Sequence, residues 1–151
     1  MIRPILMAPA PELERRCAPV TGFDAALQAL VADLFDTLYE AQGRGLAAPQ
    51  IGVLSRVFVM DSTWKEGTPC PEVFVNPELI KSAPEQTTQT EQCLSIPDMP
   101  LEITRPEWVV MRYRDCSGTL RQERFDGFRG RCVQHERDHL DGILITQGQA
   151  V

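Results

Sequence analysis

His135 and His139 are the only two histidines of the 151-residue chain, and they lie four residues apart, with Glu136 directly after the first. On an α-helix of about 3.6 residues per turn, this spacing places both imidazoles on one face, where they can bind one divalent cation. Glu136 can take the proton of a water on that cation without being a ligand itself. The HExxH pattern therefore predicts a hydrolytic metal site. The alternative is a solvated helix that carries two surface histidines.

Two imidazoles leave a divalent cation under-coordinated, because catalytic sites of this kind usually have three protein ligands and a water. The third ligand is expected among the thiolates and carboxylates. Cys93 is the favoured choice, because its segment EQCLS can run as a strand beside the helix. Cys132 is only three residues before His135 and is predicted to pack in the core, although spacing alone does not decide between the thiols. The remaining cysteines lie in loop-like sequence and are expected to be free thiols: Cys17, Cys70 and Cys116.

The helix that carries the histidines is expected from Phe128 to about Asp141, with Gly142 as its end. Four of its residues follow one another at spacings of four, three and four, which places them on one stripe. This stripe is predicted to face inward: Phe128, Cys132, His135 and His139. Buried imidazoles without a metal would need other hydrogen-bond partners, since an unsatisfied buried group costs about 1–3 kcal/mol.

The elements around this helix are predicted from periodicity and turn residues. Apolar residues recur at helical spacing from Thr21 to Gln42, with Thr21 and Asp24 as a capping pair, and Gly43 and Gly45 are expected to end this helix. Strands are expected at 56–60, 73–75, 107–114 and 119–124, the last two as a hairpin. The polar segment 81–100 contains three prolines and is predicted to be loop and edge strand.

The composition fits a single globular domain over residues 1–151, with 43% hydrophobic and 24% charged residues. No apolar run approaches the ~20 residues that a membrane span requires. The net charge of −6 and the absence of a Lys/Arg run argue against a nucleic-acid partner. Five cysteines without CxxC spacing argue against a disulfide framework or a zinc ribbon, and the first residues lack a secretory or transit pattern. A reducing, cytoplasmic location is therefore expected.

Three segments together resemble the signature motifs of the peptide deformylase family, in the family's order and approximate spacing. They are GRGLAAPQ at 43–50, EQCLS at 91–95 and QHERDHL at 134–140. The resemblance covers most of the chain and implies an α+β fold in which antiparallel β-sheets surround a central α-helix with the HExxH sequence. It also implies removal of the formyl group from N-formylmethionine of newly made polypeptides, with iron(II) as the usual metal and zinc, nickel or cobalt as substitutes.

The resemblance also assigns chemical roles to individual residues. It implies that Glu136 accepts the proton of the attacking water and passes it to the departing amine. The side-chain amide of Gln50 and the backbone N–H of Leu94 would stabilise the oxyanion, each by about 3 kcal/mol. The residues that it implies as ligands of the single divalent cation are Cys93, His135 and His139.

The substrate implied by the resemblance is an N-formylmethionyl peptide or nascent chain, which makes the ribosome a further expected partner. Its main chain would pair with the chain around Gly45 and Gln92 like an added strand. Arg44 would lie on the outer rim of the groove and make it more cationic, since the family often has an aliphatic residue there. A methionine side chain would enter an apolar pocket whose wall includes Cys132.

Two departures from the family pattern bear on this function. Gln92 replaces the usual glycine before the ligand cysteine, and a residue other than glycine costs about 1 kcal/mol or more if this position needs φ > 0. The chain also ends soon after the metal helix, where many relatives continue, which bears on ribosome docking. Two alternatives are a peptidase with the same water-activating helix and a catalytically silent metal-binding relative. Intact Glu136 and Gln50 argue against the silent relative.

Overall fold

The computed structural model describes residues 1–147, whose strands form two antiparallel sheets. One sheet has the order β1-β2-β3-β6-β7, and β4 and β5 form a separate pair. The strands are β1 (Gly45–Ala47), β2 (Val57–Met60), β3 (Glu72–Ser82), β4 (Gln86–Cys93), β5 (Ile96–Pro106), β6 (Trp108–Arg114) and β7 (Leu120–Asp126). The helices are α1 (Ala25–Glu40), α2 (Gly127–Leu140) and three short 3-10 helices, η1 (Pro11–Glu14), η2 (Ala48–Ile51) and η3 (Trp64–Glu66).

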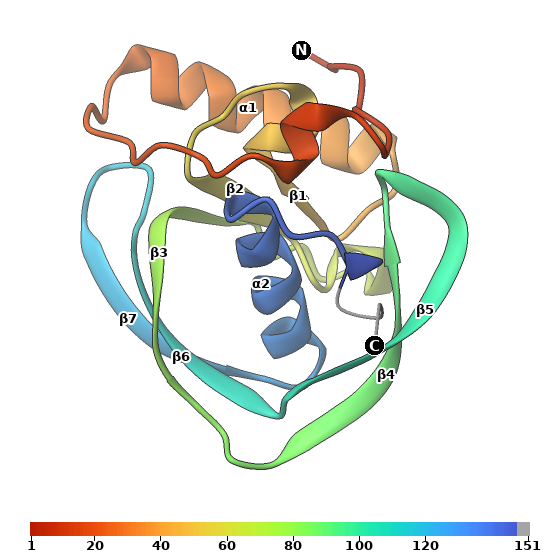
Figure 1. The fold of residues 1–151 in the computed structure, drawn as a ribbon. Helices are drawn as coiled ribbons and strands as arrows, with labels where there is room; N and C mark the ends of the chain where they lie inside the picture. Colours follow the sequence, from red (N-terminus) through yellow and green to blue (C-terminus); the bar gives the residue numbers. More distant parts are fainter. Residues whose placement is uncertain (148–151) are drawn as a thin grey trace.

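Helix α2 is central in this arrangement. Figure 1 shows it between the long strands β3, β6 and β7 on one side and the β4–β5 pair on the other, with α1 and the N-terminal segment across one end. The α+β fold with antiparallel sheets around the HExxH helix is therefore confirmed. The predicted hairpin is also confirmed, since β6 and β7 pair from Trp108 opposite Asp126 to Arg114 opposite Leu120.

Helix α1 is confirmed, but both of its predicted ends are wrong. It begins after Asp24, which alone caps it by accepting a hydrogen bond of 3.1 Å from the backbone N–H of Leu27. At the other end the left-handed residue is Gln42 (φ 58°) rather than a glycine. The N–H of Gly43 donates to the carbonyl of Leu38 at 3.0 Å, which completes a Schellman motif with a glutamine at its left-handed position.

The core has three parts that fix the layers relative to one another. Aromatic residues of the large sheet, Phe58, Phe74 and Phe125, pack beneath α2 together with Val133 and Leu140. A second cluster joins α1 to the other face of β1 and β2, and a third joins the β4–β5 pair to the N-terminal segment. Each fully buried side chain of this size contributes about 1.5–3 kcal/mol, so α2 is held by apolar contact as well as by its polar residues.

The edge strand predicted within residues 81–100 is confirmed, but the segment contains less loop than expected, because most of it belongs to the two strands β4 and β5. They pair from Gln86 opposite Pro106 to Cys93 opposite Ile96, with a register shift between Glu91 and Cys93. Prolines are compatible with this pair because both strands of a two-stranded sheet are edges, where a missing N–H need not face a partner. The register shift places Gln92 at a bulge beside Cys93.

The C-terminal end of α2 is anchored by contacts with other parts of the chain. The carbonyl of Leu140 accepts hydrogen bonds from the backbone N–H of Cys17 and from Arg56, both at 2.9 Å. Gly142 follows with φ 75°, as predicted for the residue that ends the helix, and a Cβ there would lie 2.6 Å from the backbone of Glu14. A larger residue at this position would meet both strain and a steric clash, so the glycine lets the N-terminal segment pack against the helix end.

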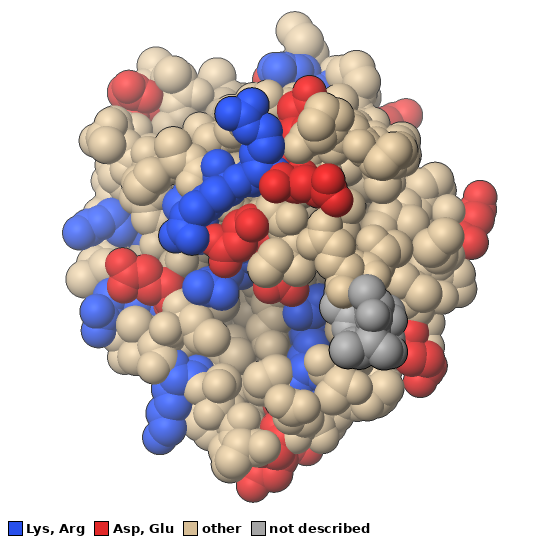
Figure 2. All heavy atoms as spheres, in the orientation of Figure 1, with Lys and Arg blue, Asp and Glu red and all other residues tan. Residues whose placement is uncertain are grey.

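Figure 2 shows basic and acidic side chains interspersed on the face viewed in Figure 1, without one extended basic area. Among residues 1–147, no helix is long and apolar enough to cross a membrane.

Candidate metal centre and active site

Cys93, His135 and His139 converge in the interior of the molecule, each at most 9% exposed. One potential ligand atom from each lies within 4.8 Å of those of the other two, and the Cys93 Sγ is 3.4 Å from His139 Nε2. The two histidines come from successive turns of α2, with their ring centroids 5.1 Å apart. The structure therefore brings the three predicted ligands together, and it places Cys93 at the end of β4 beside the helix, as expected.

This donor set fits a divalent cation. Tetrahedral zinc with a thiolate at about 2.3 Å and an imidazole at about 2.0–2.1 Å would separate the two ligand atoms by roughly 3.5 Å. The 3.4 Å between Cys93 and His139 agrees with that separation. His135 Nδ1 is engaged by a carboxylate oxygen of Glu91 at 3.1 Å, which leaves His135 Nε2 for a ligand role. The arrangement is that of a preformed site with sulfur and nitrogen ligands.

Charges around these atoms also favour a cation. Burial lowers the pKa of His135, but the neighbouring Glu136, Cys93 and Glu91 outweigh it and raise the pKa to about 10. For His139, burial and the adjacent His135 lower the pKa well below its usual value, which favours a neutral imidazole. A bound metal would supply positive charge at the place where the surrounding groups stabilise it.

Glu136 is buried against the main chain of β1. It is 4% exposed; its Oε2 lies 3.9 Å from His135 Nε2, and its Oε1 has no hydrogen-bond partner among the described residues. Burial raises the pKa of Glu136 to about 7, and a nearby cation would lower it again. A Cβ on Gly45 would lie 2.7 Å from Glu136 Oε2, so β1 can approach this carboxylate only with a glycine there. A buried carboxylate therefore lies beside the potential ligand atoms, and one of its oxygens has no partner within residues 1–147.

Gln50 is 1% exposed, and its amide has a fixed orientation. The backbone N–H of Ala47 donates to Gln50 Oε1 at 3.0 Å, so the amide NH2 must point the other way. It donates to Ser95 Oγ at 3.0 Å and lies 3.8 Å from Cys93 Sγ. The N–H of Leu94, the other predicted oxyanion donor, has no backbone acceptor among residues 1–147. Both predicted donors are therefore next to Cys93.

A groove of about 580 Å³ leads from the surface to these groups. Its lining includes all four predicted substrate-binding residues, Arg44, Gly45, Gln92 and Cys132, together with Glu136. Cys132 Sγ also belongs to the core beneath α2, and burial raises the pKa of its thiol well above the usual value. Cys132 therefore packs in the core, as predicted, and also forms part of the groove wall.

The rim of the groove differs from expectation at two residues. Phe128 was predicted to face inward but is 54% exposed, and the guanidinium of Arg44 lies 5.4 Å from its ring centroid. Arg44 also donates to the carbonyl of Ser62 at 2.7 Å and pairs with Glu66 at 2.9 Å, so much of its charge is balanced by a neighbouring loop.

Gln92 is exposed on this groove and is not among the residues with positive φ. The glutamine therefore avoids the strain that a left-handed conformation would have imposed on it.

Three charged residues that no sequence pattern had indicated lie behind the three potential ligands: Glu91, Arg105 and Arg131. Glu91 contacts His135, and both arginines contact Glu91, at 2.6 Å from Arg105 Nε and 3.0 Å from Arg131 Nη2. The only available sequence signal was the position of Glu91 two residues before Cys93 on a strand, which can place two side chains on the same face. No local pattern pointed to the arginines.

The fold and the HExxH helix at the end of a groove define a hydrolase of the metal-dependent class. The family model described as "Polypeptide deformylase" matches residues 2–149. The chain belongs to this family, whose reaction is the hydrolytic removal of the N-formyl group from newly made polypeptides. The predicted family, fold class and activity are thereby confirmed.

Individual relatives agree with this result. A peptide deformylase of Rhizorhabdus wittichii is 46% identical over 149 residues, which cover 95% of this chain and 84% of the relative. The crystal structure of a peptide deformylase from Legionella pneumophila matches with a TM-score of 0.94 and 38% identity, over 99% of this chain and 87% of that one. The peptide deformylase structure from Thermotoga maritima matches with a TM-score of 0.93 and 35% identity, over 100% of this chain and 99% of that one.

Proposed function

We propose that residues 1–151 act as one catalytic domain in which Cys93, His135 and His139 hold a divalent cation beside Glu136. The observation that carries this proposal is the convergence of the three ligand atoms within 4.8 Å at the inner end of the groove. When bound there, a divalent cation supplies Lewis-acid chemistry, since it lowers the pKa of a coordinated water from about 15.7 to about 7.

The residues of the chain carry the proton and stabilise the developing charge. Glu136 accepts a proton from the attacking water as the new C–O bond forms, and its Oε1, which has no partner in the described part of the chain, can make that contact. The carbonyl oxygen gains negative charge and is stabilised by Gln50 Nε2 and the N–H of Leu94. Glu136 then gives its proton to the amine nitrogen as the C–N bond breaks. Formate and a peptide with a free amino group leave.

The groove supports a linear peptide as the substrate. Its lining contains the backbone of Gly45 at the start of β1 and of Gln92 at the bulge of β4, two segments that can pair with an extended chain. Apolar groups such as Leu94 and Cys132 then provide the wall for a methionine side chain. Iron(II) is the proposed native cation, with zinc, nickel and cobalt as substitutes, because thiolate and imidazole ligands accept each of these metals.

The proposed setting of the reaction is the cytoplasm, on nascent chains at the ribosome. All five cysteines are free, which is typical of proteins in a reducing compartment.

The proposal is tested with two peptides that differ only at the amino end, formyl-Met-Ala-Ser and acetyl-Met-Ala-Ser, with release of the free amine as the readout. The metal-loaded protein is expected to turn over the formyl peptide, and chelation is expected to abolish the turnover until metal is restored. An internal peptide without a formyl group serves as the control for peptidase activity. Cleavage of that control at a comparable rate would contradict the proposal.

Gln50→Leu is expected to lower kcat by about 10²- to 10³-fold, the usual loss for one oxyanion donor. The substitution keeps much of the side-chain volume but removes the NH2 group that faces Cys93 and Ser95. Steady-state kinetics with formyl-Met-Ala-Ser measure the effect, and metal content and the melting temperature are recorded alongside. Ser95→Ala is the matched control, since it removes the partner of the amide and leaves the donor in place. An unchanged kcat in Gln50→Leu would exclude the proposed role.

A further inference from the structure

Behind the ligand histidine lies a buried carboxylate with an unusually complete set of partners. Glu91 Oε1 accepts from Arg105 Nη2 at 2.9 Å and contacts His135 Nδ1 at 3.1 Å. Glu91 Oε2 accepts from Arg105 Nε at 2.6 Å and contacts Arg131 Nη2 at 3.0 Å. These four contacts match the roughly four acceptor sites of a carboxylate, so this group has little freedom to turn.

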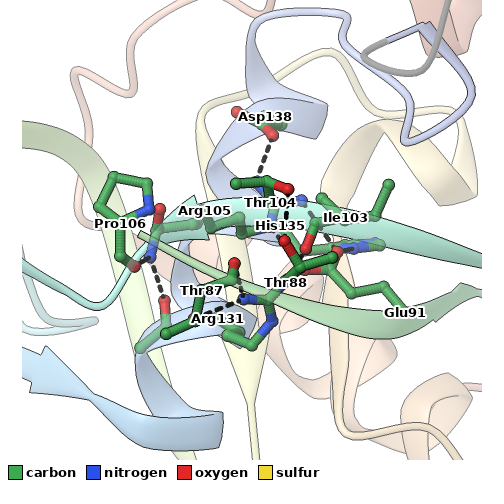
Figure 3. Close-up of polar contacts among 12 residues, drawn as sticks. Thr87, Thr88, Glu91, Ile103, Thr104, Arg105, Pro106, Arg131, His135 and Asp138 are labelled. Atoms are coloured by element: carbon green, nitrogen blue, oxygen red, sulfur yellow. Dashed lines mark hydrogen bonds and ion pairs between the residues drawn. The ribbon is translucent and has the colours of Figure 1, made fainter. Parts of the chain in front are cut away.

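Arg105 reaches two parts of the metal site at once. Two of its nitrogens hold Glu91 on β4, and its third, Nη1, donates to Asp138 on α2 at 2.9 Å. Figure 3 shows the last contact as the dashed line between Arg105 and Asp138, the residue directly before His139. One guanidinium therefore links the strand that ends in Cys93 to the helix turn that carries His139.

Arg131 holds the same strands from the helix side. Besides Glu91, it donates to the carbonyl and the hydroxyl of Thr87 on β4, each at 3.2 Å, and to the carbonyl of Ile103 on β5. Figure 3 shows Arg131 beside the paired strands with its contact to Thr87. Arg105, Arg131, Glu91 and Asp138 carry two positive and two negative charges, so the ion pairs of this network balance one another.

We infer that Arg105 is a positioning residue for the metal site, acting through Glu91 and Asp138 with the support of Arg131. It fixes Glu91 so that His135 donates from Nδ1 and presents Nε2 toward Cys93 and His139. Partners of this kind orient metal-bound histidines in many proteins, and their loss typically weakens metal affinity about 10- to 100-fold. The inference rests on the proposed function, since it concerns the same three ligands.

A lysine cannot replace Arg105 in this arrangement. The planar guanidinium grips both oxygens of Glu91 and still has a nitrogen for Asp138, whereas an ammonium group is a single point of charge. Arg105→Lys therefore keeps the positive charge but cannot contact both oxygens of Glu91 and Asp138 at the same time. Arg129→Met is the matched control, since Arg129 also pairs with two carboxylates, Glu72 and Glu123, and lies on α2 outside the lining of the groove.

The experiment measures zinc affinity by competition with a chelator, on the full chain at one pH. Arg105→Met and Arg105→Lys are expected to bind zinc about 10- to 100-fold more weakly than the wild type, with Arg129→Met unchanged. A second readout uses the two imidazoles, the only ones in the chain. In the zinc-loaded protein, the Nδ1–H resonance of His135 is expected to move in the Arg105 variants and to stay in place in Arg129→Met.

Asp138→Asn and Glu91→Gln keep the inference testable if Arg105→Met does not fold, and both are expected to weaken zinc binding. Wild-type affinity in a folded Arg105→Met protein, with an unmoved His135 resonance, would overturn the inference while leaving the proposed function in place. A wild-type protein that binds no zinc, iron or cobalt would instead remove the proposed metal centre, and this inference with it.

Discussion

Glu136→Gln is expected to lower kcat for formyl-Met-Ala-Ser by about 10²- to 10⁴-fold, the usual contribution of a general acid–base group. Glutamine has nearly the same size and fits the buried position, which is 4% exposed. The amide cannot accept the proton of the attacking water or deliver it to the departing amine. Since Glu136 Oε1 has no hydrogen-bond partner among residues 1–147, Glu136→Gln removes no hydrogen bond at this atom. Metal content should therefore stay at the wild-type level.

Two comparisons make this result specific to the carboxylate. Glu136→Asp keeps a base but shortens the side chain, so its rate should fall between those of the wild type and Glu136→Gln. Glu78→Gln makes the same chemical change at an exposed position of β3 and should leave kcat unaltered. The decisive measurement is kcat at saturating peptide together with metal analysis of each preparation. Equal rates for the wild type and Glu136→Gln would exclude the proposed proton transfer.

The helix at the centre of the site could be predicted from local spacing. Two histidines four residues apart must share a face of a helix, and Gly142 was a clear stop signal. The position of Cys93 beside them depends on tertiary structure, and the residue pattern alone left the choice of a third ligand open. The resemblance to the family motifs favoured Cys93, because these motifs combine three distant segments of the chain.

The network behind the ligands lay beyond the reach of sequence patterns. Arg105 meets Glu91 because β4 and β5 pair in one particular register, which places Thr87 opposite Arg105 and Glu91 opposite Leu101. The segment 81–100 was predicted to be loop and edge strand, because it is polar and contains three prolines, and that prediction named no partner strand for it. Because no register for this pairing could be derived from the sequence, no partner could be predicted for the two arginines.

At Gln92 the sequence raised a concern about backbone strain that the structure does not bear out. A glutamine in place of glycine is costly only where φ is positive, and Gln92 is not among the positive-φ residues. The register shift beside it lets the chain reach Cys93 with ordinary backbone angles. The substitution therefore changes the surface of the groove while the ligand cysteine keeps its place near His139.

Cys93→Ala is expected to have the largest effect, with loss of stoichiometric metal and of measurable deformylation. The Sγ of Cys93 is the only sulfur in the described metal-ligand group, and it lies 3.4 Å from His139 Nε2. Without it, two imidazoles remain for a cation that usually takes three protein ligands. The side chain is small and buried at 5% exposure, so alanine leaves only a small cavity and the fold should persist. Metal analysis after gel filtration, with the melting temperature of the metal-free protein, measures both expectations.

Cys70→Ala is the control for this substitution, because it removes a thiol that is exposed and does not line the groove. It should keep one metal ion per chain and wild-type turnover. Cobalt loading adds a spectroscopic test, since a thiolate ligand gives the cobalt protein an absorption band that imidazole ligands do not. That band should be present in the wild type and Cys70→Ala and absent in Cys93→Ala. A Cys93→Ala protein that keeps its metal and its turnover would show that the third ligand is another group, and the proposed site would have to be rebuilt around it.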